Sequence, residues 1–157
     1  MLMKNKKLIF SIITIVVLVV AGGWFFGFKG KPNFGQGEII IGGRVFGVEI
    51  AETVMTRAQG LSGQEKLGEN EGMLFVFSVP SIQGFWMKDM KFPIDIVWIR
   101  GDKIVGFAEK VQPEPEKTVF GLTVYYSPEP VDRVLEVNAG TVARSGSKVG
   151  DLVYFNK

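Results

Sequence analysis

The sequence predicts a mainly β domain, a compact antiparallel barrel or sandwich with one or two short helices, preceded by an N-terminal transmembrane helix. About eight or nine short runs rich in β-branched and aromatic residues follow one another at close spacing, separated by turn residues. Long amphipathic helical patterns are missing, which disfavours a doubly wound α/β fold. The transmembrane helix is predicted by a single uncharged run, residues 8–28.

That uncharged run would span about 32 Å as a helix, close to the roughly 30 Å of a bilayer core. Lys4, Lys6 and Lys7 precede it, which favours a cytoplasmic N-terminus and a single-pass protein of the cell membrane with an extracytoplasmic soluble domain. A cleaved signal peptide is the alternative, but its apolar part is usually only about 7–15 residues long. We therefore expect a cytoplasmic tip and anchor at 1–28, a linker at 29–37 and the β-rich domain at 38–157.

The first elements of the domain carry clear turn and cap signals. Gly42 and Gly43 join two β-branched runs, as in a two-residue hairpin. Thr53 is a candidate N-cap for a short helix that ends near Gly60 or Gly63. The strands expected after this helix cover residues 73–77, 85–88, 94–99, 104–111, 118–126, 131–137 and 149–155, with one or two helical turns at 139–146.

The missing residue types exclude several kinds of chemistry. The chain contains no Cys and no His, so it has no thiolate nucleophile, no histidine base and none of the usual transition-metal ligands. No phosphate-binding glycine motif is present, and we expect no cofactor and no metal. Beyond the three lysines of the N-terminal tip, 15 basic residues face 16 acidic ones without a basic tract, which argues against nucleic-acid binding.

Carboxylates therefore offer the enzymatic alternative. Asp89, Asp95 and Glu136 lie within or beside apolar strand sequence, where burial could raise a pKa and provide a general acid. A glycoside hydrolase would need two such groups about 5–9.5 Å apart. The structural alternative is that these carboxylates point outward or accept hydrogen bonds from loop amides.

Trp86 and Lys88 would share one face of an extended strand. An indole beside an ammonium group could stack on a sugar ring and bind its hydroxyls, in a pocket that is apolar with a few placed polar groups. The alternative is a core Trp86 with Lys88 extending over it toward solvent.

Several motifs resemble the domain of unknown function 192 family of small prokaryotic proteins. They are "RAQGLSG", "EGMLFVF", "FWMKDMKFPIDIVWI", "VLEVNAG" and "SGSKVGDLV", in that order, and the resemblance covers about residues 47–155. Four positions depart from the family pattern: Ser62 replaces a usual Met, Asp89 a usual Asn, Met90 a usual Thr, and Ile94 a usual Leu. The departures at 89 and 90 alter the polar end of the signature.

The resemblance implies a small β-rich domain without an assigned activity, and it implies that Arg57, Trp86, Lys88, Asp95 and Glu136 act together. With Asp89 added, these six residues are the candidate ligand site, and no catalytic residue is assigned. We expect a membrane-anchored, non-catalytic module that binds a small polar ligand or an envelope saccharide. The alternatives are a structural partner of a membrane protein, a carboxylate-based hydrolase, or a buried network in which Arg57 pairs with Asp95 or Glu136.

Overall fold

The structure, a computed structural model, describes residues 32–157. The helices are α2 Val54–Gln59 and α3 Thr141–Ser145, with a 3-10 helix at Val119–Gly121. The strands are β1 Gly35–Ile41, β2 Arg44–Ala51, β3 Glu71–Ser81, β4 Gly84–Phe85, β5 Ile94–Arg100, β6 Lys103–Val111, β7 Tyr125–Tyr126, β8 Val131–Asn138 and β9 Tyr154–Asn156.

The transmembrane helix expected at residues 8–28 lies outside the described residues. Between 32 and 157, neither α-helix has the length and apolar character needed to cross a bilayer. The prediction of a mainly β fold with two short helices is confirmed.

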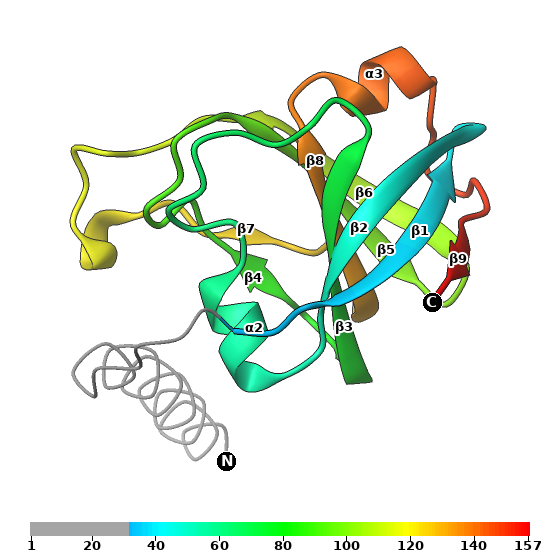
Figure 1. Cartoon of the computed structure of the whole chain (residues 1–157), viewed down its shortest axis with the longest axis horizontal. Coiled ribbons are helices and arrows are strands. Elements are labelled where there is room, and N and C mark those ends of the chain that lie inside the picture. The colour runs from blue at the N-terminus through cyan, green and yellow to red at the C-terminus, as the bar shows by residue number, and fades with distance from the viewer. Residues whose placement is uncertain (1–31) are drawn as a thin grey trace, which may run out of the picture. The chain divides into compact units, whose positions relative to one another are not determined.

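The main sheet has seven strands in the order β6-β5-β8-β3-β2-β1-β9 (Figure 1). The expectation of an antiparallel arrangement is wrong at one place, because β2 and β3 run parallel. Parallel neighbours need a crossover connection rather than a tight turn. The chain supplies one through α2 and the loop that follows it, so the sheet is mixed.

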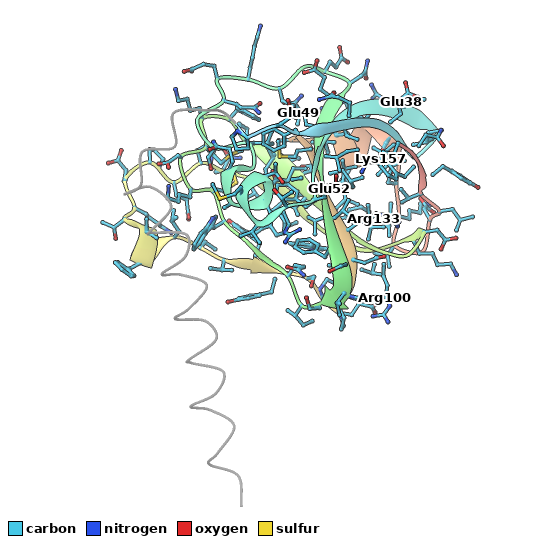
Figure 2. All side chains as sticks on the ribbon, turned by 60° about the horizontal axis from the view of Figure 1, so that its bottom comes forward. Glu38, Glu49, Glu52, Arg100, Arg133 and Lys157 are labelled. Carbon is cyan, nitrogen blue, oxygen red and sulfur yellow. The ribbon has the colours of Figure 1, made fainter. Side chains whose placement is uncertain are left out.

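The expected barrel is also incorrect, since β6 and β9 stand at opposite ends of the strand order. A single isolated bridge, Lys103 with Leu152, joins the two edges, and a ladder does not form there. Beside β9, the ammonium group of Lys157 pairs with the carboxylate of Glu52 at 2.8 Å (Figure 2). The sheet is therefore strongly curled but open.

Each face of the sheet carries its own apolar cluster. The inner cluster draws side chains from every strand of the main sheet and from α3, with Phe46, Leu74 and Val97 among them. The outer cluster lies on β3, β5 and β8, around Met73 and Trp98. We call the segments over this second cluster the cover layer: α2 with the 60–70 loop, residues 84–92, and residues 112–126. Of the candidate residues, Arg57, Trp86, Lys88 and Asp89 lie in this layer, whereas Asp95 and Glu136 lie in the main sheet.

Local signals explain the elements that the sequence predicts correctly. Gly42 and Gly43 have φ of +54° and +72°, the two positive values that a tight hairpin turn requires. Thr53 Oγ1 caps α2 by accepting a hydrogen bond from the Thr56 backbone N–H, and Thr56 Oγ1 accepts one from the backbone N–H of Thr53. Gly60 ends the helix at φ +50°.

Three predicted strands are much shorter than expected. The strand expected at 85–88 is only Gly84–Phe85, that at 118–126 is only Tyr125–Tyr126, and that at 149–155 becomes Tyr154–Asn156. β4 and β7 pair with each other in a separate two-stranded sheet. An apolar alternating pattern forms a long strand only where a partner strand lies beside it, and these segments have partners over two or three residues.

Candidate functional site

The signature segment leaves the strand conformation directly after Phe85. Lys88 and Asp89 form a turn, and Asp89 has φ of +55°, in the left-handed region that Asp and Asn tolerate better than most residues. The turn is held from the neighbouring loop, because Ser62 Oγ donates to the Lys88 carbonyl at 2.8 Å and Gly63 N–H to the Asp89 carbonyl at 2.9 Å. Ser62, one of the departures from the family pattern, thus fixes the turn.

Because the chain turns at Lys88 and Asp89, the side chains of Trp86 and Lys88 lie in different surroundings. Trp86 is half-buried, and the next side chain, Met87, is fully buried in the outer apolar cluster. The predicted shared strand face does not exist, since β4 ends at Phe85. Lys88 instead forms an ion pair with Asp89 at 2.5 Å.

A pocket of about 310 Å³ opens beside this turn, between residues 87–91 and the 114–122 loop. Its apolar lining is Met87, Met90, Pro115, Val119 and Leu122. Its polar lining consists of charged side chains of both signs: Lys88, Asp89, Lys91, Glu114 and Lys117. The volume is at the lower end of the range of small-ligand sites, and the lining combines apolar and charged side chains in equal number.

The loop that forms the far wall is organised around Glu114. Its carboxylate accepts hydrogen bonds from Lys117 Nζ at 2.6 Å, from Thr123 N–H at 2.8 Å and from Thr123 Oγ1 at 2.7 Å. These bonds, that from Lys117 foremost, lower the pKa of Glu114 to about 2. Residues 112–117 fall between two expected strands and contain no predicted candidate residue, so Glu114 is missed. The short Glu-x-x-Lys spacing is the signal that could have found it.

Arg57 lies elsewhere and binds backbone. Its guanidinium donates to the carbonyls of Glu52 at 2.7 Å and Val76 at 3.0 Å, and it lies 5.1 Å from the centre of the Phe77 ring. These contacts tie the end of β2 to β3 across α2. Its hydrogen bonds go to these carbonyls rather than to a carboxylate of Asp95 or Glu136.

Asp95 is fully buried on β5, and its carboxylate accepts three backbone N–H bonds. The donors are Lys110 at 2.8 Å, Gly140 at 3.1 Å and Val142 at 2.9 Å. Lys110 has φ of +53° at a bulge of β6, an unfavourable conformation that persists where its surroundings impose it. Asp95 therefore holds both this bulge and the start of α3.

Glu136 is buried without such partners. It lies on β8, 5% exposed, between Met73 of β3 and Ile96 of β5 in the sheet register. Within the described part of the chain, no hydrogen bond or ion pair reaches its carboxyl group. Desolvation raises the pKa of Glu136 to about 8, so the group is mainly protonated at neutral pH.

Asp95 and Glu136 point to opposite faces of the sheet. In the register of β5 against β8, Asp95 lies opposite Val137, and Glu136 lies opposite Ile96. Successive side chains of a strand point to opposite faces of the sheet, so the two carboxyl groups do so as well. Val137 belongs to the inner cluster and Ile96 to the outer one. A hydrolase needs its two carboxyl groups in one cleft, so this register excludes a glycosidase site built from the pair.

The structure thus disperses the six candidate residues. Lys88 and Asp89 line the pocket, Trp86 lies before them in the chain without lining it, and Arg57, Asp95 and Glu136 occupy three separate positions. A larger open hollow of about 490 Å³ lies at the β5–β6 turn and includes Arg100 but none of the six. Arg100 is labelled in Figure 2.

Comparisons with known proteins agree with the sequence motifs. Residues 38–155 match the family model DUF192, described as "Uncharacterized ACR, COG1430". A crystal structure from Sinorhizobium meliloti, whose name proposes a transcription regulator, is 31% identical with a TM-score of 0.71, over 80% of this chain and 98% of that chain. A protein of unknown function from Novosphingobium aromaticivorans is 31% identical with a TM-score of 0.67, over 77% of this chain and 84% of that one. A search of curated proteins finds no match.

Proposed function

Because this chain belongs to the DUF192 family of uncharacterized proteins, its function must be argued from its own site, and we propose a non-catalytic binding module for a small polar ligand. The observation that carries the proposal is the pocket in which the polar end of the signature meets the Glu114 loop. The uncharged run at residues 8–28 supports a second part of the proposal, that the module is anchored in the cell membrane and faces the extracytoplasmic side.

The charges of the pocket favour a ligand that carries polar or charged groups of its own. Lys88 and Asp89 form one ion pair at its rim, and Lys117 and Glu114 form another. In each pair one partner is exposed, Asp89 at 51% and Lys117 at 45%, so a ligand carboxylate or hydroxyl can reach a charged group of the pair. The methionine side chains of the lining are adaptable and can accommodate the apolar part of the ligand.

Stacking of a sugar on Trp86 has less support than binding at this pocket. Trp86 is half-buried, which leaves ring surface for contact, but it is not among the residues that line the pocket. An envelope saccharide would therefore bind through Lys88 and Asp89 rather than through the indole.

A thermal-shift screen of residues 32–157 tests the proposal. This part contains both apolar clusters, and the related structure from S. meliloti, of which 98% is covered, folds with little beyond it. We expect a ligand among sugars, amino acids and cell-wall fragments to raise the melting temperature in a concentration-dependent way. Lys88→Met should abolish the shift, and Asp89→Asn should alter it while preserving the turn.

Lys148→Met is the matched control, because Lys148 is an exposed lysine outside the pocket. A ligand whose shift persists in Lys88→Met would bind elsewhere and would contradict the assignment of this pocket. The absence of any shift across the screen would contradict the binding function itself.

A further inference from the structure

Exposed apolar side chains gather at the tip of the loop that walls the pocket. Phe120 is 93% exposed, Val119 41% and Val124 37%, and Tyr126 on β7 is 65% exposed. Figure 1 shows the 3-10 helix at the end of a loop that projects away from the main sheet. Single exposed apolar residues are ordinary, but several grouped on one projecting tip are a feature of interaction sites.

The sequence outside the described residues limits what this tip can reach. The uncharged run ends at residue 28, and β1 begins at Gly35, so six residues, 29–34, connect them. Six residues reach about 20 Å when fully extended. A domain of this size is roughly 35 Å across, as its expected radius of gyration is about 14 Å. An anchored chain therefore holds its domain against the membrane surface.

The connection leaves the domain on the side that carries the loop. Phe34, directly before β1, packs against the outer apolar cluster, and Tyr125 packs against the same cluster from β7. α2 also belongs to this side, with Val54 59% and Met55 45% exposed. Phe34, where the connection joins the domain, and the exposed apolar residues of the cover layer thus lie on one side of the sheet.

We propose that the loop tip, residues 117–124, contacts the bilayer surface to which residues 8–28 anchor the chain, with Phe120 inserted at headgroup depth. This inference rests on the anchor included in the proposed function; Lys117, Val119 and Leu122 of the tip also line the ligand pocket, but the test below uses no ligand. Aromatic side chains favour the membrane–water interface, which suits an exposed phenylalanine at the tip. A short tether also keeps the tip at high local concentration near lipid.

A second copy of the chain fits this tip less well than a lipid surface does. Each partner in a stable dimer contributes about 800 Å² of interface. The tip presents one aromatic ring and two valines, and a large aromatic residue buries only about 150–250 Å². Insertion into lipid needs no complementary protein surface, so a small apolar tip is sufficient.

The chain contains no cysteine, so one introduced thiol reports one position. The full chain is reconstituted in vesicles of phosphatidylcholine and phosphatidylglycerol at 3:1, with an environment-sensitive fluorophore on Thr118→Cys. Thr118 is exposed and its side chain makes no capping bond. The control is Val149→Cys, 63% exposed in a loop that pairs with the β6 edge rather than in the cover layer.

We expect the label at 118 to shift to shorter wavelength and to be quenched at least about twofold more than the label at 149 by lipids with a nitroxide headgroup. Adding Phe120→Ser should reduce quenching at 118 to the level at 149. Because Phe120 is exposed, this change should leave the melting temperature unaltered.

Equal quenching at 118 and 149, or quenching that Phe120→Ser leaves unchanged, would overturn the proposal while leaving the anchor intact. If the label at 118 were protected from quenching in detergent as the protein concentration rises, and if copies of the chain cross-linked, the tip would be assigned to a second copy instead. A chain that fails to float with the vesicles would overturn the anchor and this inference together. None of these outcomes bears on ligand binding, which is measured on residues 32–157.

Discussion

Replacing Glu136 by glutamine should remove a large pH dependence of stability. Burial raises the pKa of this carboxyl group from its ordinary 4.5 to about 8, and no partner compensates for the lost hydration in the described structure. The folded state therefore holds a proton that the unfolded state releases. This contribution to stability is complete below pH 4.5 and is lost progressively as the pH rises toward 8.

The size of this effect on the free energy of unfolding follows from the two pKa values of Glu136, in the unfolded and in the folded state. At about 1.36 kcal/mol for each pH unit, the difference between 4.5 and about 8 amounts to about 5 kcal/mol. About 3 kcal/mol of this would already be lost at pH 7. Whole domains are stable by only about 5–15 kcal/mol, so the effect should be measurable without special conditions.

Urea unfolding of residues 32–157, followed by tryptophan fluorescence at several pH values from 5 to 8, measures the effect. The quantity of interest is the free energy of unfolding of Glu136→Gln minus that of the wild type. We expect this difference to rise by about 3 kcal/mol between pH 5 and pH 8. The glutamine amide adds a constant offset of its own, so the change with pH is the relevant quantity. A difference that stayed constant within about 0.5 kcal/mol would refute the assignment of Glu136 as a buried, unpartnered acid.

Three further predictions concern stability and use the same unfolding assay. Asp95→Ala removes the acceptor of three backbone N–H bonds and should cost at least about 3 kcal/mol, whereas a cost below about 1 kcal/mol would contradict its structural role. Thr53→Ala removes the α2 cap and should lower the free energy of unfolding by about 1 kcal/mol. An unchanged free energy of unfolding would mean that the cap bond does not form in solution. Gly42→Ala should destabilise by more than about 1 kcal/mol, because its Cβ would lie 2.5 Å from the Ser145 carbonyl oxygen, while Gly43→Asn has open space and should be tolerated. Equal stability of the two glycine variants would contradict the turn geometry.

The sequence predicts correctly those strands whose apolar pattern is matched by neighbouring strands along their whole length. The run at 94–99 is buried on both faces of the sheet, and the Gly42–Gly43 turn determines the pairing of its two strands. The parallel pairing of β2 with β3 could not be predicted in the same way. Each strand has an ordinary apolar pattern, and only the packing of the crossover shows which neighbour it joins.

The candidate site was predictable in its chain segment but not in its geometry. The motifs select the turn at Lys88 and Asp89 correctly, because its residue types are unusual for a core strand. The pattern predicts a strand at 85–88 with a turn from Asp89 onward, but it reveals neither the left-handed conformation of Asp89 nor the end of the strand at Phe85. Asp95 and Glu136 look alike in sequence, and only the register of β5 against β8 places them on opposite faces. Phe120 resembles a core residue because composition does not reveal the absence of a covering partner.

The contacts of Asp95 have a consequence for the conditions under which the domain can fold. Its carboxylate joins β5 to a segment 15 residues away and to another 45–47 residues away. Small secreted domains often use disulfides for such long-range links, and those links depend on an oxidising compartment. Here the link consists of hydrogen bonds in a chain without cysteine. We therefore expect thiol reductants to leave the fold untouched, so that the protein made in a reducing cytosol has the same structure as the protein made outside it.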